Sequence, residues 1–351
     1  MSIILKVYAM LVRKPNCLEK LLHDKSWILA DGATGTNLFN LGLSSGDAPE
    51  LWNKTARNKI KALYRGSIDA GSDLFLTNSF GANRSRLKLH GAEDQATELS
   101  RVSAEIGREI ADAYTRTVIV AGCIGPTGEL MEPMGNLSYS GAVEIFHEQA
   151  EGLKAGGADL AWIETISSAD EFLAAAEGVH LADMPWCGTM SFDTAGRTMM
   201  GLTAPEMVKL IKKVPNQPIA FGANCGVGAS DLLRTILGFS QTNTSVPRIA
   251  KGNAGIPKYH KGRIFYDGTP ELMTQYAILA RDCGATIIGG CCGTTPNHLR
   301  AMRTGLETHE PQEPPSLKTI QSTLGAFSSE SDGTDGNAPT RKRQNRRHKT
   351  S

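Results

Sequence analysis

The sequence lacks a hydrophobic run long enough to cross a membrane. No apolar stretch reaches the roughly 20 residues that a transmembrane helix requires. Residues 1–13 are mildly apolar, but Lys6 interrupts them and no cleavage site of small residues follows, which argues against a signal peptide. We therefore expect a cytoplasmic protein without a membrane-bound part.

An excess of either charge is also missing. Lys and Arg together number 37 and Asp and Glu 36, which gives a formal net charge of +1. Because positive and negative charges nearly balance, the composition gives no reason to expect nucleic acid or a membrane surface as a partner. Hydrophobic residues make up 40% of the 351 residues, enough for one large domain or two ordinary ones.

The cysteines do not form an even set. There are seven of them in a long chain without a secretory signal, which argues against a disulfide framework and leaves metal binding or catalysis. Taken singly, we expect Cys17, Cys123, Cys187 and Cys283 to be inert side chains.

What the sequence does contain is a repeated alternation of apolar and polar segments. Eight apolar runs of four to eight residues lack strict alternation, as expected for parallel strands that are buried on both faces. The runs are Trp27–Asp31, Asp73–Asn78, Val118–Gly122, Leu160–Glu164, Trp186–Phe192, Pro218–Asn224, Arg248–Asn253, which is the least apolar, and Thr286–Gly290.

The intervening stretches have helical spacing. Examples are Ala56–Ala70, Asp94–Ala113, Ala142–Ala155, Ala204–Lys213 and Pro270–Asp282. Eight strand–helix repeats predict an α/β fold of the (β/α)₈ TIM-barrel type. A doubly wound open sheet is the alternative, but no Gly-x-Gly-x-x-Gly follows the first strand.

Composition divides the chain into three parts. Residues 1–25 form an N-terminal extension and helix, and residues 26–309 form the barrel. Residues 310–351 begin with prolines, continue with Ser, Gly and Asp, and end in a basic cluster. This composition predicts a disordered basic C-terminal tail.

Three cysteines stand at strand ends, where barrels of this kind place their active sites. Cys225 ends the sixth run, and Cys291 and Cys292 follow the eighth, between glycines that let the backbone leave strand geometry. Their thiolates can therefore bind one Zn²⁺ and leave a fourth tetrahedral position open, as in catalytic zinc sites. A redox pair of the two adjacent cysteines is the alternative, although it lacks the Cys-x-x-Cys spacing.

Such a zinc ion suits a substrate thiol. Three thiolates leave the complex anionic, so it is a poor activator of water but a good site for a soft ligand. Coordination lowers the pKa of a bound thiol from about 8.5 to below physiological pH. The sulfur remains electron-rich, and alkylation of that sulfur is the natural reaction.

The strand ends resemble those of the homocysteine S-methyltransferase family over about residues 26–306. The motifs that carry the resemblance are Asp31-Gly-Ala-Thr-Gly-Thr36, Thr77-Asn-Ser-Phe-Gly81, Gly125-Pro-Thr-Gly128, Ile163-Glu-Thr165, Gly222-Ala-Asn-Cys-Gly226 and Gly289-Gly-Cys-Cys-Gly-Thr294. The resemblance implies a (β/α)₈ barrel, zinc held by Cys225, Cys291 and Cys292, and homocysteine held by Asp31 and Glu164.

Physical chemistry suggests how homocysteine would be bound. Glu164 is a candidate acceptor for its ammonium, and the loop that starts at Gly32 can offer backbone N–H groups to its carboxylate. Asp31 can also cap the following helix. Thr77, Asn78 and Asn253 are further candidate contacts, with hydrogen bonding within the strand ends as the alternative.

The resemblance leaves the methyl donor open among betaine, S-methylmethionine and methylcobalamin. The length leaves no room for separate folate and cobalamin domains, so we expect a small onium donor. Betaine is favoured, because the sequence looks closest to bacterial members assigned to it. The tyrosines of the animal betaine enzymes correspond, however, to Gly81 and Thr165. The rings that can replace them in a cage for a quaternary ammonium are Trp52, Trp162, Phe80, Phe39 and Tyr139.

The expected partners are therefore homocysteine and a small onium donor, and the sequence does not indicate an oligomeric state. The alternatives are an S-methylmethionine enzyme, a homocysteine-activating module for a methylated corrinoid protein, and a non-catalytic zinc-binding interaction protein. The acids Asp31 and Glu164 beside the metal ligands argue against the last of these.

Overall fold

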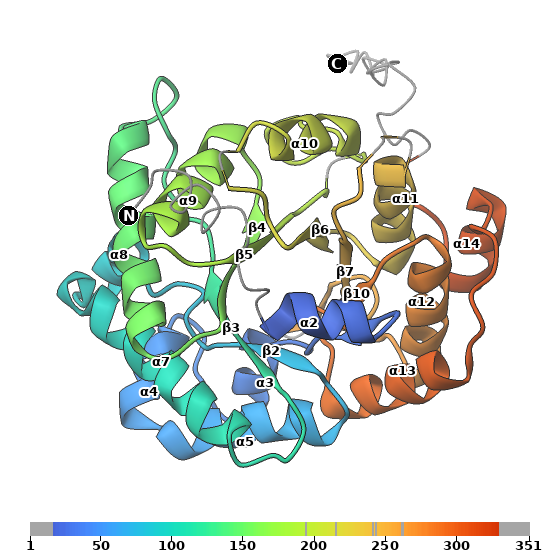
Figure 1. Cartoon of the computed structure of the whole chain (residues 1–351), viewed down its shortest axis with the longest axis horizontal. Helices are drawn as coiled ribbons and strands as arrows, with labels where there is room; N and C mark the ends of the chain where they lie inside the picture. Colours follow the sequence, from blue (N-terminus) through green and yellow to red (C-terminus); the bar gives the residue numbers. More distant parts are fainter. Residues whose placement is uncertain are drawn as a thin grey trace, which may run out of the picture.

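The computed structural model describes residues 17–329, apart from residues 194, 215, 241, 243 and 261–262. Eight parallel strands form one sheet in the order β1-β10-β7-β6-β5-β4-β3-β2. The sheet curves into a barrel with helices around its outside (Figure 1). The predicted (β/α)₈ fold is thereby confirmed.

Each of the eight predicted runs overlaps a barrel strand, the weakly apolar seventh run included. The strands are β1 Ile28–Leu29, β2 Leu74–Leu76, β3 Ile119–Ile124, β4 Leu160–Ile166, β5 Trp186–Met190, β6 Ala220–Cys225, β7 Arg248–Gly252 and β10 Ile287–Gly290. A separate antiparallel hairpin, β8 Lys258–His260 and β9 Arg263–Phe265, is inserted between β7 and the next helix.

Helices follow the strands, and several of them begin at polar caps. Ser168 precedes α9 and Thr203 precedes α10, and each side chain accepts a hydrogen bond from a backbone N–H of the first turn. The helices are α2 Cys17–Asp24, α3 Gly35–Asn40, α4 Trp52–Thr55, α5 Arg57–Asp69, α6 Arg84–Leu87, α7 Ala96–Ala111, α8 Tyr139–Ala155, α9 Ala169–Leu181, α10 Ala204–Ile211, α11 Ala229–Ser240, α12 Pro270–Asp282, α13 Pro296–Thr308 and α14 Leu317–Leu324.

Two aspartates help to close the barrel where β1 meets β2. The N–H of Asp73 donates to the carbonyl of Leu29 at 2.7 Å, and the Asp73 carboxylate accepts from the Leu29 N–H at 3.0 Å. Nearer the other end of the seam, Oδ2 of Asp31 accepts from the N–H of Leu76 at 2.8 Å. Hydrogen bonds of the two carboxylates thus help to join β1 and β2, which stand at the two ends of the strand order.

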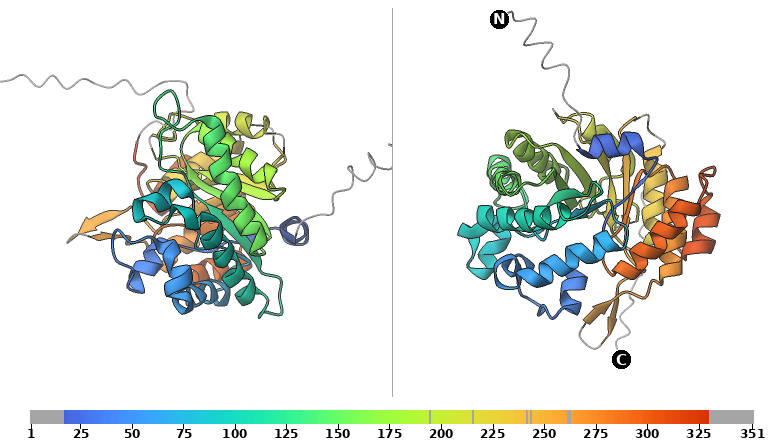
Figure 2. Two further views of the ribbon diagram at one scale, coloured as in Figure 1. Left: turned by 90° about the vertical axis from the view of Figure 1, so that its left-hand side faces the viewer. Right: turned by 60° about the horizontal axis from the view of Figure 1, so that its bottom comes forward.

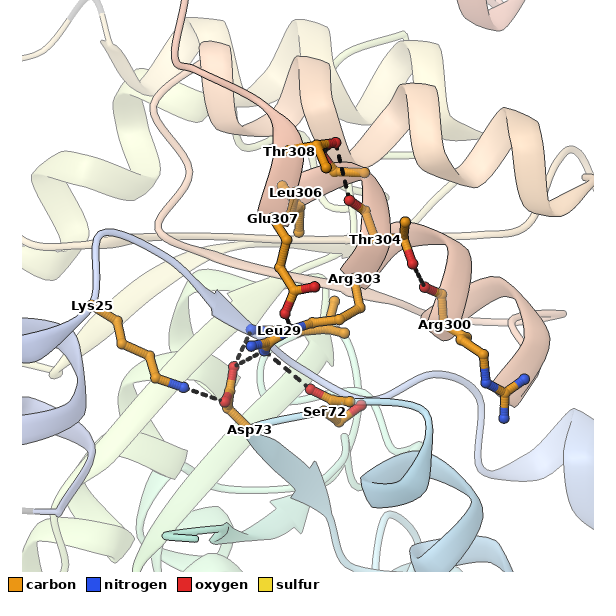
Figure 3. Close-up of polar contacts among 12 residues, drawn as sticks. Lys25, Leu29, Ser72, Asp73, Arg300, Arg303, Thr304, Leu306, Glu307 and Thr308 are labelled. Atoms are coloured by element: carbon orange, nitrogen blue, oxygen red, sulfur yellow. Dashed lines mark hydrogen bonds and ion pairs between the residues drawn. The ribbon is translucent and has the colours of Figure 1, made fainter.

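Asp73 is almost fully buried and has three cationic neighbours, of which the most distant, Arg116, has its Nη1 3.9 Å from Oδ1. Nζ of Lys25 lies 2.6 Å from Oδ1, and Nη1 of Arg303 lies 3.1 Å from Oδ2 (Figure 3). Because Asp73 precedes β2, this ion-pair cluster lies at the N-terminal ends of the strands, away from the end where barrel active sites form.

The barrel interior is apolar at its base and polar at its C-terminal end. Alternate strand residues point inward, and the lower ones, among them Ile119, Leu160 and Ile249, pack with Leu18 of α2 in one buried cluster. Helix α2 and the β8–β9 hairpin lie at opposite ends of the barrel (Figure 2). Helix α2 therefore covers the end that does not carry the predicted site.

Order extends further along the chain than composition indicates. Helix α14, within the segment expected to be disordered from residue 310, packs against α11 and α12 with Ile320 fully buried. Beyond it, Ser328 donates two hydrogen bonds to Asp231, which is paired with Arg234. The apolar spacing of a single short helix in a polar segment gives too weak a signal for sequence reasoning. The basic residues 330–351 lie outside the described residues.

Within the described part of the chain, no helix combines the length and the apolar character that crossing a bilayer would require.

Candidate metal centre and substrate site

The three predicted cysteines converge at the C-terminal end of the barrel. Cys225 is the last residue of β6, and Cys291 and Cys292 follow directly after β10. Their sulfur atoms all lie within 4.8 Å of one another, and each residue is half-buried. We call these three residues the cysteine triad.

Unusual backbone geometry brings the sulfurs together. Cys225 has a φ of +60°, in the left-handed region that side chains with a Cβ rarely adopt, and Gly293 has a φ of +79°. The N–H of Cys292 donates to Oδ1 of Asn253 at 3.0 Å, and Nδ2 of Asn253 donates to the carbonyl of Gly226 at 2.9 Å. Asn253 thus holds the two cysteine-bearing loops against each other.

The triad has the donor set and the spacing of a metal site. The pKa of the Cys292 thiol is lowered, because Cys225 and then Cys291 donate hydrogen bonds to its sulfur. Three thiols whose sulfurs lie this close together can bind a soft divalent cation when they lose their protons. Three sulfur ligands would leave one position of a tetrahedral zinc free for a further ligand.

Asn224 connects the triad to the neighbouring strands. Its Oδ1 accepts from the N–H of Thr165 at 3.0 Å and from the hydroxyl of Thr189 at 2.8 Å. Its Nδ2 donates to the hydroxyl of Thr165 at 2.7 Å and lies 3.8 Å from the sulfur of Cys291. Its position immediately before Cys225 is a signal for such a supporting role, but we did not predict that role from the sequence.

Glu164, on β4, has one carboxylate oxygen available for a ligand. Its Oε1 accepts a hydrogen bond from the thiol of Cys123 at 3.2 Å. Its Oε2 is buried and has no hydrogen-bond partner among the described residues. Burial raises the pKa of Glu164 to about 7, and the nearby ammonium of Lys251 partly opposes this shift. A buried carboxylate oxygen without a partner is the feature expected where a substrate donor binds.

Asp31, the other predicted acid, already has partners within the protein. Its Oδ1 is 2.6 Å from Nζ of Lys251, and its Oδ2 accepts from the N–H of Leu76. Burial raises the pKa of Asp31, and Lys251 opposes the shift. The two acids are therefore not equivalent, because only Glu164 has a free oxygen to offer.

Lys251 was missed by sequence reasoning. It lies on β7, its side chain is 2% exposed, and its neighbours in the sheet are Asn224 and Gly289. The available signal was a lysine in an otherwise apolar run, which we interpreted as a weak strand. A buried lysine on a barrel strand indicates instead that an anionic partner is present inside the barrel.

The remaining polar candidates are bound largely by the protein itself. Thr77 bonds the hydroxyl of Ser79 at 2.7 Å and accepts from the N–H of Cys123. Asn78 donates to the carbonyl of Pro49 and to the side chain of Asn53. These contacts support the loops at the C-terminal end of the barrel, and a direct contact of either residue with substrate stays a prediction.

Gly32 lies where two loops pack closely. A Cβ at this position would stand 2.6 Å from the carbonyl oxygen of Thr294, so glycine is required by the packing alone. The N–H of Ala33 already donates to that same oxygen at 3.1 Å, and helix α3 has only six residues. Binding of a substrate carboxylate by this loop also stays a prediction.

The aromatic rings proposed for a quaternary ammonium are either exposed or already face a cation of the protein. Phe39 is 49% exposed and Tyr139 is 40% exposed, and the Tyr139 hydroxyl bonds Glu177. The other three rings already face a cation of the protein, in the pairs Trp52–Lys59, Phe80–Arg86 and Trp162–Lys251.

One aromatic ring that we did not predict lies beside the triad. Tyr266 follows the β8–β9 hairpin, and its hydroxyl helps to lower the pKa of the Cys292 thiol. A Cβ on Gly293 would stand 2.4 Å from the Cβ of Tyr266, so the Tyr266 side chain packs directly against the Gly293 backbone. Nε2 of His298 lies 2.9 Å from the carbonyl oxygen of Gly268 and fixes the base of the hairpin to the start of α13.

Comparisons with known proteins agree with this geometry. The family model described as homocysteine S-methyltransferase matches residues 28–306. Methionine synthases of Mycobacterium leprae and Mycobacterium tuberculosis are each 28% identical over 291 residues, which is 78% of this chain and 24% of each synthase. The chain thus spans about a quarter of the length of these relatives.

Solved structures show the same architecture. The oxidised form of the homocysteine methyltransferase MmuM from Escherichia coli has a TM-score of 0.69 at 25% identity, covering 83% of this chain and 99% of that one. Its metallated form has a TM-score of 0.69 at 24% identity, covering 82% and 99%, which shows likeness of fold.

Proposed function

The chain belongs to the homocysteine S-methyltransferase family, and we propose that it transfers a methyl group from a small onium donor, betaine, to the thiol of homocysteine. The observation that carries this proposal is the cysteine triad at the C-terminal end of the barrel. In the reaction a sulfur–carbon bond forms and the nitrogen–carbon bond of betaine breaks. The thiol proton is released, and the products are methionine and dimethylglycine.

The triad is the proposed zinc site, and bound zinc would lower the pKa of the homocysteine thiol so that it reacts as a thiolate. Asn224 and Asn253 keep the triad in place through the hydrogen bonds to Cys291, Cys292 and the Gly226 carbonyl. No protein nucleophile is required, because the substrate supplies its own sulfur. The protein then contributes chiefly by aligning the two substrates.

We propose that Glu164 binds the ammonium of homocysteine through Oε2. This oxygen is buried and has no partner among the described residues, whereas both oxygens of Asp31 are bonded. We further propose that Tyr266 forms one wall of the donor pocket, because its ring lies beside Cys292 and aromatic faces attract onium groups. The proposed reaction needs reduced thiols, which suits the cytoplasm, and all seven cysteines are free.

Two other donors remain candidates. S-methylmethionine is also a small onium compound, and its sulfonium group would contact the same Tyr266 ring. A methylated corrinoid protein is favoured by the similarity to one part of the methionine synthases. In that case the chain would act as the homocysteine-activating module.

A side-by-side assay separates these donors. Zinc-loaded protein would be incubated with homocysteine and with betaine, S-methylmethionine or a methylcorrinoid, each carrying a labelled methyl group, and methionine would be measured by mass spectrometry. We expect labelled methionine with betaine and none with Cys291→Ala. Label from S-methylmethionine or the methylcorrinoid alone would reassign the donor. No label from any of the three would overturn the proposed activity.

A further inference from the structure

Lys251 is a buried cation that has no role in the proposed reaction. Its ammonium lies 2.6 Å from the Asp31 carboxylate, and the two side chains are 2% and 6% exposed. Taking two charges out of water costs several kcal/mol per ion, and apolar side chains often replace a buried ion pair without loss of stability. Stability is therefore a weak explanation for an ion pair at this place.

Its position connects Lys251 to the candidate site. It neighbours Asn224 across β6 and β7, and Asn224 contacts the sulfur of Cys291. The anionic groups that act on its ammonium are Asp31, then Glu164, then Cys291. Lys251 therefore lies among three anionic groups: the cysteine triad, Glu164, which has a free oxygen, and Asp31, which has none.

Lys251 also has unused hydrogen-bonding capacity. A lysine ammonium has three N–H donors, and among the described residues one hydrogen bond of Nζ, that to Asp31, is made. Each oxygen of Asp31 already accepts one hydrogen bond, Oδ1 from Lys251 and Oδ2 from the N–H of Leu76, so Asp31 has less acceptor capacity left than Glu164. Of the three charged side chains, Lys251 thus has free donors and Glu164 has an acceptor oxygen without a partner, while the neutral Nε1 of Trp162 is a further buried donor without a partner among the described residues.

We propose that Lys251 is a specificity-determining residue that binds the α-carboxylate of homocysteine while Glu164 binds the ammonium. This inference rests on the proposed function and deepens it. A zwitterionic amino acid carries one charge of each sign on the same carbon, and Lys251 and Glu164 offer one complementary charge each. Asp31 remains the internal counter-ion that keeps Lys251 charged and oriented.

Two analogues of homocysteine separate the two charges. The analogue 3-aminopropane-1-thiol keeps the thiol and the ammonium but lacks the carboxylate, and 4-mercaptobutanoate keeps the thiol and the carboxylate but lacks the ammonium. Binding of each thiol to the zinc-loaded protein would be measured by calorimetry without any methyl donor. In the wild type, 3-aminopropane-1-thiol should bind at least about tenfold more weakly than homocysteine, as expected for a lost hydrogen bond to a charged group.

The variants test whether Lys251 causes this difference. Lys251→Met removes the ammonium at similar volume, and the double variant Lys251→Met with Asp31→Asn also removes the charge that would be left unpaired. In both, the ratio of homocysteine affinity to 3-aminopropane-1-thiol affinity should fall about tenfold or more. Glu164→Gln should instead lower the ratio of homocysteine affinity to 4-mercaptobutanoate affinity. Zinc content and thermal unfolding would be measured for every variant.

Two results would overturn the inference. The first is equal binding of homocysteine and 3-aminopropane-1-thiol by the wild type, which needs no variant to fold. The second is an unchanged ratio in a folded variant that lacks Lys251. Failure of the proposed function has a different signature, namely tight thiol binding with the expected ratios but no methionine from any of the three donors.

Discussion

Replacing Glu164 by Gln should weaken homocysteine binding while the fold and the zinc site are kept. Gln retains a carbonyl oxygen that can accept from the Cys123 thiol, as Oε1 of Glu164 does at 3.2 Å. The substrate ammonium, however, loses a charged acceptor. Such a hydrogen bond contributes about 1.5–3 kcal/mol, which corresponds to a rise in KM of about 10- to 150-fold.

The pH dependence gives an independent measure of the same interaction. Because burial raises the pKa of Glu164 to about 7, its carboxyl is protonated at low pH and cannot then serve as a charged acceptor. The ionised fraction is about one tenth at pH 6 and about nine tenths at pH 8. The value of kcat/KM for homocysteine, which reports ionisations of the free enzyme, should therefore rise about ninefold between these pH values through this group. Glu164→Gln should remove that part of the profile.

Steady-state kinetics from pH 5.5 to 9, with zinc content measured in parallel, provide the assay. Glu307→Gln is a matched control, since Glu307 pairs with Arg303 on α13 near the opposite end of the barrel (Figure 3). Cys123→Ala removes the thiol that bonds Oε1 but leaves the carboxylate, so its KM should change less. An unchanged KM in Glu164→Gln together with lost zinc would refute the reasoning and make Glu164 a supporting residue of the metal site.

Further experiments address the metal, the C-terminal segment and the transfer itself. Replacing any cysteine of the triad by Ala should abolish activity and reduce the zinc content well below about one ion per chain. The control variant Cys283→Ala should retain both activity and zinc. Full activity of a metal-stripped triad variant would exclude the site. Truncation after Ser329 should leave catalysis intact, but Ile320→Ala should lower the free energy of unfolding by about 2–5 kcal/mol without changing KM, as measured by denaturant unfolding. An unaffected unfolding free energy would mean that α14 does not pack on α11 and α12 in solution. A chiral methyl group should be inverted during transfer, because one direct displacement is expected; net retention would require a methylated protein residue.

Much of the architecture could be read from local patterns. Buried parallel strands appear as continuous apolar runs, and this signal located all eight barrel strands, including Arg248–Gly252. The cysteines could be grouped from sequence because a barrel brings the ends of all its strands to one rim, whatever their separation along the chain. The motifs at these strand ends also carry the resemblance to the family.

Other features depended on contacts between distant segments. The pairing of Lys251 with Asp31 joins residues 220 positions apart, and nothing local in either strand indicates it. The same pairing leaves Glu164 as the acid with a free oxygen, although the sequence presents the two acids as equals. Tyr266 reaches Cys292 only because a hairpin is inserted after β7, and short hairpins give little periodicity to detect.

The sequence by itself thus determined the fold class, the eight strands and the three thiols, since each follows from residue type and short-range spacing. The tertiary structure alone decided which polar groups remain free for a substrate. Hydrogen-bond capacity is used up by partners from anywhere in the chain: Leu76 and Lys251 occupy Asp31, and no described residue occupies Oε2 of Glu164. The barrel sets which polar groups keep a partner, because it brings the inward side chains of eight strands close enough to hydrogen-bond one another.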